Sequence, residues 1–184
     1  MFSWLARNRP GGREGAAAAE LALVLPILVI ILFGLIEFGR LFHDFDVVAK
    51  GVRNAARYLA HIPSQGCADA GGGNVTWSPK ATNPNAIAQT KEMATFGQFA
   101  DGTETLRLAS FTVATVNVST PCPLNTDSLE GVYVGGVGGA PLERTRRADV
   151  TAVVNITFMF GELVIPGLSN LTMTVTHREP HIGD

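Results

Sequence analysis

The chain has 184 residues, of which 46% are hydrophobic and 16% are charged, and its formal net charge is −2. The charged fraction is below the roughly 25% usual in soluble domains. No Lys/Arg-rich run follows the first 15 residues, so the charge pattern excludes an electrostatic basis for binding nucleic acid. The length accommodates one membrane anchor and one domain of ordinary size.

An uncharged apolar block lies close to the N-terminus. Residues 21–36, LALVLPILVIILFGLI, carry no charged side chain, and four alanines at 16–19 come shortly before them. Together they have about the length that a helix needs to cross a hydrocarbon core of ~30 Å. Glu20 interrupts the block near its start, where a carboxylate in lipid is energetically costly. We therefore predict a transmembrane helix over residues 16–40.

Three kinds of N-terminal segment have such a block. A secretory signal peptide needs small residues after its apolar core, but here the core runs into the bulky and charged sequence EFGRLF at 37–42. An uncleaved signal anchor fits the length and leaves Glu20 without a role. A prepilin-type leader is short and basic, ends in Gly, and is followed by an acid at the fifth position of the mature chain. Residues 1–15, with cleavage between Gly15 and Ala16, fit this third pattern.

A family resemblance rests on the same residues. The run GREGAAAAELALVLPILVIILFGLIEFGRLF, followed by VRNAARYLA, resembles the TadE-like family, the pseudopilin-like proteins of the bacterial tight-adherence (Flp/Tad) pilus machinery. The resemblance is specific over residues 13–60 and loose from there to Asp184. It implies a single-pass protein of the inner membrane that is cut by a prepilin peptidase and has its C-terminal domain in the periplasm. It further implies that other pilins or pseudopilins and the pilus assembly platform are partners.

The resemblance also implies an assembly role for Glu20. Cleavage after Gly15 creates a new α-amino group on Ala16, which is largely protonated at neutral pH. Ala16 and Glu20 are spaced i,i+4, so the two charges can pair within one helix. The resemblance implies that in an assembling pilus Glu20 can instead meet the N-terminus of a neighbouring subunit and set its axial register. The alternative is that Glu20 only marks the membrane edge by reaching the headgroups.

The predicted helix continues beyond the membrane as an amphipathic segment over residues 41–62. Glu37 and Arg40, spaced i,i+3, are predicted to pair where the helix leaves lipid. Apolar residues then recur at alternating spacings of four and three, which predicts one buried stripe: Leu41, Phe45, Val48, Val52, Ala55 and Leu59. Pro63 ends the helix, so we expect one helix from Ala16 to about Ala60 that packs its stripe on the chain's own sheet.

Residues 63–184 are predicted to form an exported α+β domain. Residues 64–85 are rich in Gly, Asn, Ser and Pro, which predicts a loop, and Gly131–Gly139 predicts a flexible loop or a weak hairpin. A short helix is expected over Ala86–Phe96 with Asn85 as its cap. One-sided alternation predicts antiparallel strands at Phe111–Val118 with a bulge near Val113 and a possible extension to Arg107–Ala109, at Val150–Phe160 and at Leu171–Thr176.

The predicted fold class is therefore α+β. The long N-terminal transmembrane and amphipathic helix is expected to pack on a three- to four-stranded antiparallel sheet, as in pilins.

Cys67 and Cys122 are the two cysteines of the chain. Their separation of 55 residues excludes C-x-x-C redox and zinc motifs. In an oxidising compartment such a pair predicts a structural disulfide, which would stabilise the fold by roughly 4 kcal/mol on the chain-entropy model. Two unrelated buried thiols are the alternative.

No pattern predicts catalytic, cofactor or metal chemistry. The glycine-rich stretch 131–139 lacks the Lys-Ser/Thr of a P-loop, and Pro180 lies between His177 and His181, so this segment, which also holds Glu179, predicts a solvated tail rather than a metal site. We expect a non-enzymatic protein. It is either a minor pilin or pseudopilin that takes part in pilus assembly or priming, or a permanently anchored periplasmic binding or adhesive domain with an uncleaved N-terminus.

Overall fold

The computed structural model describes residues 13–69, 74–99, 105–123, 145–161, 167 and 169–183. Its elements, in chain order, are α1 (Arg13–His61), β1 (Ser64–Asp69), β2 (Val75–Pro79), α2 (Ala86–Thr95), the 3-10 helix η1 (Val113–Thr115), β3 (Val116–Ser119), β4 (Arg147–Thr157) and β5 (Asn170–Pro180). The chain forms two compact units. The first contains residues 1–40 and 158–169, and the second contains residues 41–157 and 170–184.

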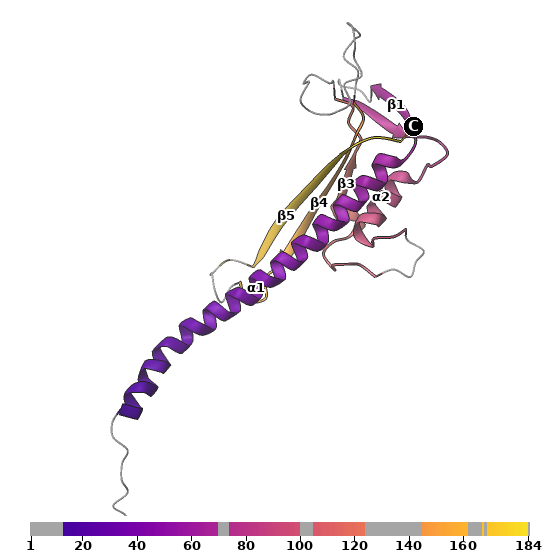
Figure 1. The fold of residues 1–184 in the computed structure, drawn as a ribbon. Helices are drawn as coiled ribbons and strands as arrows, with labels where there is room; N and C mark the ends of the chain where they lie inside the picture. Colours follow the sequence, from indigo (N-terminus) through magenta and orange to yellow (C-terminus); the bar gives the residue numbers. More distant parts are fainter. Residues whose placement is uncertain are drawn as a thin grey trace, which may run out of the picture. The chain divides into compact units, whose positions relative to one another are not determined.

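The second unit is built on a three-stranded antiparallel sheet with the order β3-β4-β5 (Figure 1). β4 and β5 pair in unbroken register, from Arg147 opposite Pro180 to Thr157 opposite Asn170. Every second residue of β4, from Ala148 onward, is buried in the core, as the pleat of a strand with one covered face requires. The α+β class and the antiparallel sheet that the sequence predicts are confirmed.

The C-terminal half of α1 covers the inner face of this sheet (Figure 1). Four members of the predicted stripe are fully buried: Val48, Val52, Ala55 and Leu59. They share one hydrophobic core with β4, Trp77 and Phe111, and each large side chain so buried contributes about 1.5–3 kcal/mol. Of the first two members of the predicted stripe, Leu41 is half-buried and packs against this core, whereas Phe45 is exposed.

α2 packs against the same half of α1. A Cβ added to Gly51 would lie 2.3 Å from the carbonyl oxygen of Ala94, so the two helices approach as closely as a glycine allows. About two turns further on, the Tyr58 hydroxyl donates a hydrogen bond of 2.9 Å to Oε1 of Gln89. The predicted helix is confirmed to within one residue. Asn85 occupies the cap position, but its side chain makes no capping hydrogen bond.

The predicted loop at 64–85 is wrong in part, because β1 and β2 form an antiparallel hairpin within it. Its central side chain, Trp77, is buried and donates an indole N–H hydrogen bond of 2.8 Å to the carbonyl of Arg147. The backbone N–H of Trp77 also donates to the carbonyl of Thr120 at 2.9 Å. The hairpin is therefore held by docking onto distant segments, which local composition does not reveal.

The first predicted strand, Phe111–Val118, is too long. Val113–Thr115 forms the 3-10 helix η1, capped by reciprocal hydrogen bonds between Thr112 and Thr115, and β3 begins only at Val116. The alternating pattern is interrupted near Val113, which predicted a bulge. The structure has the 3-10 turn at this place instead. The proposed extension at Arg107–Ala109 lies outside the strands of the sheet.

The ends of β4 and β5 also differ from the prediction. β4 ends at Thr157 rather than Phe160, and β5 continues through Pro180. The predicted solvated tail is therefore wrong, because the strand ladder opposite Arg147 extends that far. The predicted loop at Gly131–Gly139 lies outside the described residues.

The segment after β5 closes over the end of α1. The N–H groups of Ile182 and Gly183 donate to the carbonyl of Ala60 at 2.9 and 3.1 Å. Nε2 of His181 lies 2.8 Å from the carbonyl oxygen of Ile62, to which it donates, and the imidazole ring packs 4.3 Å from the Trp77 ring. These contacts satisfy carbonyls that a helix end leaves without an intrahelical partner.

Candidate functional site

The N-terminal half of α1 is a helix without a protein core around it. Between Leu21 and Ile36 most of its large apolar side chains are exposed, and only Val29 and Phe33 are half-buried. The helix is long and apolar enough to span a membrane. A helix that is apolar on every side needs an apolar environment on every side. Lipid supplies that environment, so this half is the membrane anchor of the protein.

The predicted processing residues lie at the start of this helix. Gly15 and Ala16 are both exposed, and no atom lies within 4 Å of a Cβ added to Gly15. α1 begins at Arg13, three residues before its predicted start. The Gly15–Ala16 bond therefore lies in the first helical turn, which opens most readily because its amide groups lack intrahelical acceptors.

Glu20 lies on the same face of α1 as Ala16, one turn further on. The side chain is exposed, and four residues of helix separate the two positions by about 6 Å along the axis. No ion pair involves Glu20 among the described residues. Its carboxylate is thus free to meet a cation that comes from outside this helix or from a newly formed N-terminus.

A second cluster in the same unit was missed by the sequence analysis. The start of the connection between β4 and β5 lies against α1, where the ring of Phe160 stacks on that of Phe33 with centroids 4.5 Å apart. The backbone N–H of Met159 donates a hydrogen bond of 2.9 Å to Oε1 of Glu37. The predicted Glu37–Arg40 pair is wrong, since Glu37 accepts from this loop instead. The sequence feature that could have revealed this cluster is the apolar run after β4. The predicted strand Val150–Phe160 included the start of that run as strand residues.

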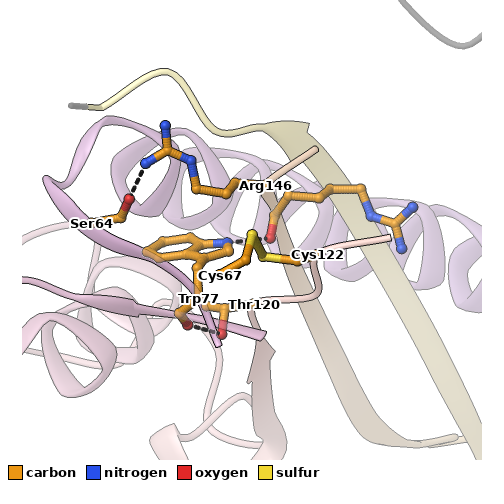
Figure 2. The surroundings of a disulfide bond; sticks show 7 residues. Ser64, Cys67, Trp77, Thr120, Cys122 and Arg146 are labelled. Atoms are coloured by element: carbon orange, nitrogen blue, oxygen red, sulfur yellow. Dashed lines mark hydrogen bonds between the residues drawn. A yellow bond between two sulfur atoms is a disulfide. The ribbon is translucent and has the colours of Figure 1, made fainter. Parts of the chain in front are cut away.

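Cys67 and Cys122 are joined by a disulfide in the second unit, with Cα atoms 6.1 Å apart (Figure 2). The bond links β1 to the residues that follow β3. The Cys122 N–H also donates to the carbonyl of Val75 at 2.8 Å, and the Trp77 indole lies beside the two sulfur atoms (Figure 2). The covalent link therefore reinforces the docking of the β1–β2 hairpin.

Ionisable side chains of the sheet have structural partners. Asp149, nearly buried, receives two hydrogen bonds of 2.7 and 2.9 Å from the Arg147 guanidinium. His177 lies 2.8 Å from Oε1 of Glu179 within β5. In the part of the chain that the structure describes, no group of three or more His, Cys, Asp or Glu side chains is arranged to hold a metal ion.

The model of one protein family, described as TadE-like protein, matches residues 15–57. The match includes Gly15, Ala16 and Glu20, the whole membrane anchor, and the start of the helical segment that packs on the sheet. Comparison with curated proteins and with solved structures finds no match. Residues 15–57 are thus TadE-like, as their sequence predicts, and the fold beyond them is described by its own residues.

Proposed function

We propose, from the TadE-like identity of residues 15–57, that this protein is a minor pilin or pseudopilin of a Flp/Tad pilus system. In this proposal a prepilin peptidase cuts the chain between Gly15 and Ala16, and the mature protein takes part in assembling or priming the pilus. One observation carries the proposal. An exposed apolar helix begins with the small exposed residues Gly15 and Ala16 and has an accessible carboxylate, Glu20, one turn later.

The physical reason lies in the cost of a charge in lipid. A carboxylate at the centre of a bilayer costs about 2.5–3.5 kcal/mol on insertion scales and less near the edge. Removal of the leader would create an ammonium group at Ala16, on the face of α1 that carries Glu20. Either this group or the equivalent group of a neighbouring subunit would neutralise Glu20. The second pairing would also set the axial register between two adjacent helices.

The proposed location is the bacterial inner membrane, with the second unit on the periplasmic side or in the pilus. The disulfide supports this orientation, because disulfides form and persist in oxidising compartments such as the periplasm. The proposed partners are the prepilin peptidase, other pilins or pseudopilins and the assembly platform. We propose no catalytic activity and no cofactor for the protein.

The first test is the N-terminus of the protein extracted from membranes. Intact mass and N-terminal sequencing should show a chain that begins at Ala16 or at its methylated form. A mature protein that begins at Met1 would instead support a permanently anchored binding or adhesive domain. A protein that begins after residue 36 would support an ordinary signal peptide.

The second test separates an assembly role of Glu20 from a topological one. Glu20→Gln and Glu20→Leu should insert and be cleaved normally, but pili should be lost or should lack this subunit. Asp46→Asn is the matched control, since it removes an exposed acid from the same helix beyond the membrane. Normal pili with Glu20→Leu would leave the carboxylate as a marker of the membrane edge.

A further inference from the structure

The connection between β4 and β5 has an unusual length and composition. Thr157 and Asn170 are paired directly across the two strands, yet the residues between them, 158–169, number twelve. Connections within β-hairpins usually have two to five residues. This one has a single charged residue, Glu162, and seven large apolar ones: Phe158, Met159, Phe160, Leu163, Val164, Ile165 and Leu168. Such a segment needs an apolar partner, because its exposure to water would be unfavourable.

The start of this connection lies at a defined level of α1. Met159 is bonded to Glu37, which is the first charged residue after the apolar block, and Phe160 stacks on Phe33. Phe33 precedes Glu37 by four residues, or about 6 Å along the helix axis. Phe160 therefore lies about one helical turn deeper in the apolar segment than Met159.

α1 covers only part of the apolar surface of residues 158–160. Within residues 15–40 the half-buried positions fall on one face of α1 or beside it: Val29, Phe33, Gly34 and Glu37. Met159 remains 70% exposed, and the flanking apolar residues of the helix, Leu32 and Ile36, are exposed as well. The apolar surface of the loop is thus continuous with the surface of α1 that faces lipid. An apolar surface that continues the surface of a membrane-spanning helix is surrounded by the same lipid.

The hydrogen bond from Met159 to Glu37 fits a position at the membrane interface. A non-helical backbone group in the hydrocarbon region must be bonded within the protein, and the Met159 N–H has the Glu37 carboxylate as its acceptor. The same bond gives that carboxylate a donor where water becomes scarce. The Met159 N–H therefore meets the condition for irregular backbone at this depth.

We propose that residues 158–160 form a second membrane contact of this protein, with the side chains of Met159 and Phe160 entering the bilayer interface beside α1. The occupant of this apolar surface is lipid. Apolar side chains in such interfacial segments bury by about 5–10 Å at the boundary of headgroups and acyl chains. The protein then has two attachments to the membrane, one before its exported domain in sequence and one within it. This goes beyond the proposed role in pilus assembly and does not depend on it.

The test measures the depth of a spin label on the full chain in vesicles of phosphatidylethanolamine and phosphatidylglycerol. Met159→Cys is labelled, while the native cysteines are protected by their disulfide. Leu32→Cys in the span and Lys80→Cys, which is exposed in the second unit, are the controls. The ratio of collisions with oxygen to collisions with a water-soluble nickel complex should be severalfold higher at Met159 than at Lys80 and should approach that at Leu32.

Two results would overturn the proposal. A ratio at Met159 equal to that at Lys80, with free access of the nickel complex, would place the loop in water. Low collision rates with both reagents would show that protein covers the loop, and the partner would then be another subunit rather than lipid. Cleavage at Gly15 and pilus assembly do not enter the measurement, so its failure leaves the proposed function to its own tests.

A second variant guards against an effect of the label itself. Phe160→Asp in the Met159→Cys chain should lower the ratio severalfold toward the Lys80 value, because a carboxylate opposes insertion of the loop. Thr174→Asp, an exposed position of β5, is the matched control and should leave the ratio unchanged. Recovery of the intact Cys67–Cys122 disulfide reports that each variant is folded. An unchanged ratio with Phe160→Asp would remove Phe160 from the membrane contact.

Discussion

The two halves of α1 place apolar side chains in different surroundings. Between Leu21 and Ile36 most of these side chains are exposed and none is fully buried, whereas between Leu41 and His61 the buried ones follow one stripe. The first half has no polar face, and the second carries Asp46, Lys50 and other charged residues opposite its stripe. A helix that is apolar on all sides is thus suited to lipid, and a helix with one apolar stripe is suited to a protein core on one side and water on the other.

The largest expected effect comes from a charge in the buried stripe. Val52→Asp places a carboxylate at a fully buried position between α1 and the sheet, and no cation from the core is available to pair with it. The free energy of unfolding of the exported domain should fall by about 4–5 kcal/mol or more, as measured by urea titration of the intact protein. The neighbouring Arg53→Asp is exposed and should change it by about 0.5 kcal/mol at most. Equal effects of the two variants would contradict the assignment of the stripe.

Loss of the disulfide should destabilise the second unit alone. The double variant Cys67→Ser, Cys122→Ser removes a link between residues 55 apart and should cost roughly 4 kcal/mol on the chain-entropy model. Denaturant midpoints followed by Trp77 fluorescence should fall, since this side chain packs beside the sulfur atoms (Figure 2). Membrane insertion should be retained, because the anchor belongs to the first unit and the disulfide to the second. Loss of insertion would show that the anchor depends on a folded second unit.

Two glycines of α1 provide a matched comparison of the two halves. In Gly51→Ala the new Cβ meets the carbonyl oxygen of Ala94, so α1 and α2 must separate at a cost of about 1–3 kcal/mol. In Gly34→Ala no atom lies within 4 Å of the new Cβ, and the better helix propensity of alanine should favour the helix by up to about 1 kcal/mol. Urea midpoints should therefore shift only for Gly51→Ala. A shift of equal size in both would mean that the glycines act through the helix backbone rather than through packing.

The smallest effect is expected on the polar face. Lys50 donates a hydrogen bond of 2.6 Å to Asp46 at i,i+4, but both side chains are more than half exposed. Asp46→Asn should lower the stability by about 0.3–0.5 kcal/mol, and 1 M salt should remove most of the difference. A larger effect that persists in salt would indicate a contact of this face with another molecule.

Periodic patterns predicted the elements whose stabilising contacts repeat along the sequence. The stripe of α1, the alternation in β4 and the short α2 were visible because each repeats its apolar positions over several turns or residue pairs. The β1–β2 hairpin was missed because Trp77 holds it through partners at Thr120 and Arg147, and no local pattern encodes such distant contacts. The same reason explains the missed contact between Met159 and Glu37, which are 122 residues apart.

The candidate site was predictable to a different extent. Gly15, Ala16 and Glu20 form a short linear motif, so sequence alone was enough to select them, and the structure adds their exposure. Their chemical partners are not in the same chain segment. In the proposed function a cleavage enzyme, lipid or a neighbouring helix would supply the second half of each interaction, and the folded chain alone does not encode how these meet. The motif therefore predicts cleavage and pairing with other molecules; it does not predict a preformed pocket.

The closure of α1 by the segment after β5 has a consequence for the order of events during biogenesis. His181 binds the carbonyl of Ile62 from 119 residues further along the chain, a length that a ribosome adds in roughly 6–24 s at ~5–20 residues per second. The anchor can partition into lipid as soon as it emerges, while the carbonyls at the far end of the same helix still bond to water. Membrane insertion thus precedes completion of the helix terminus. During that interval the stripe of α1 that later carries the core is not yet buried, so it is open to chaperones and proteases.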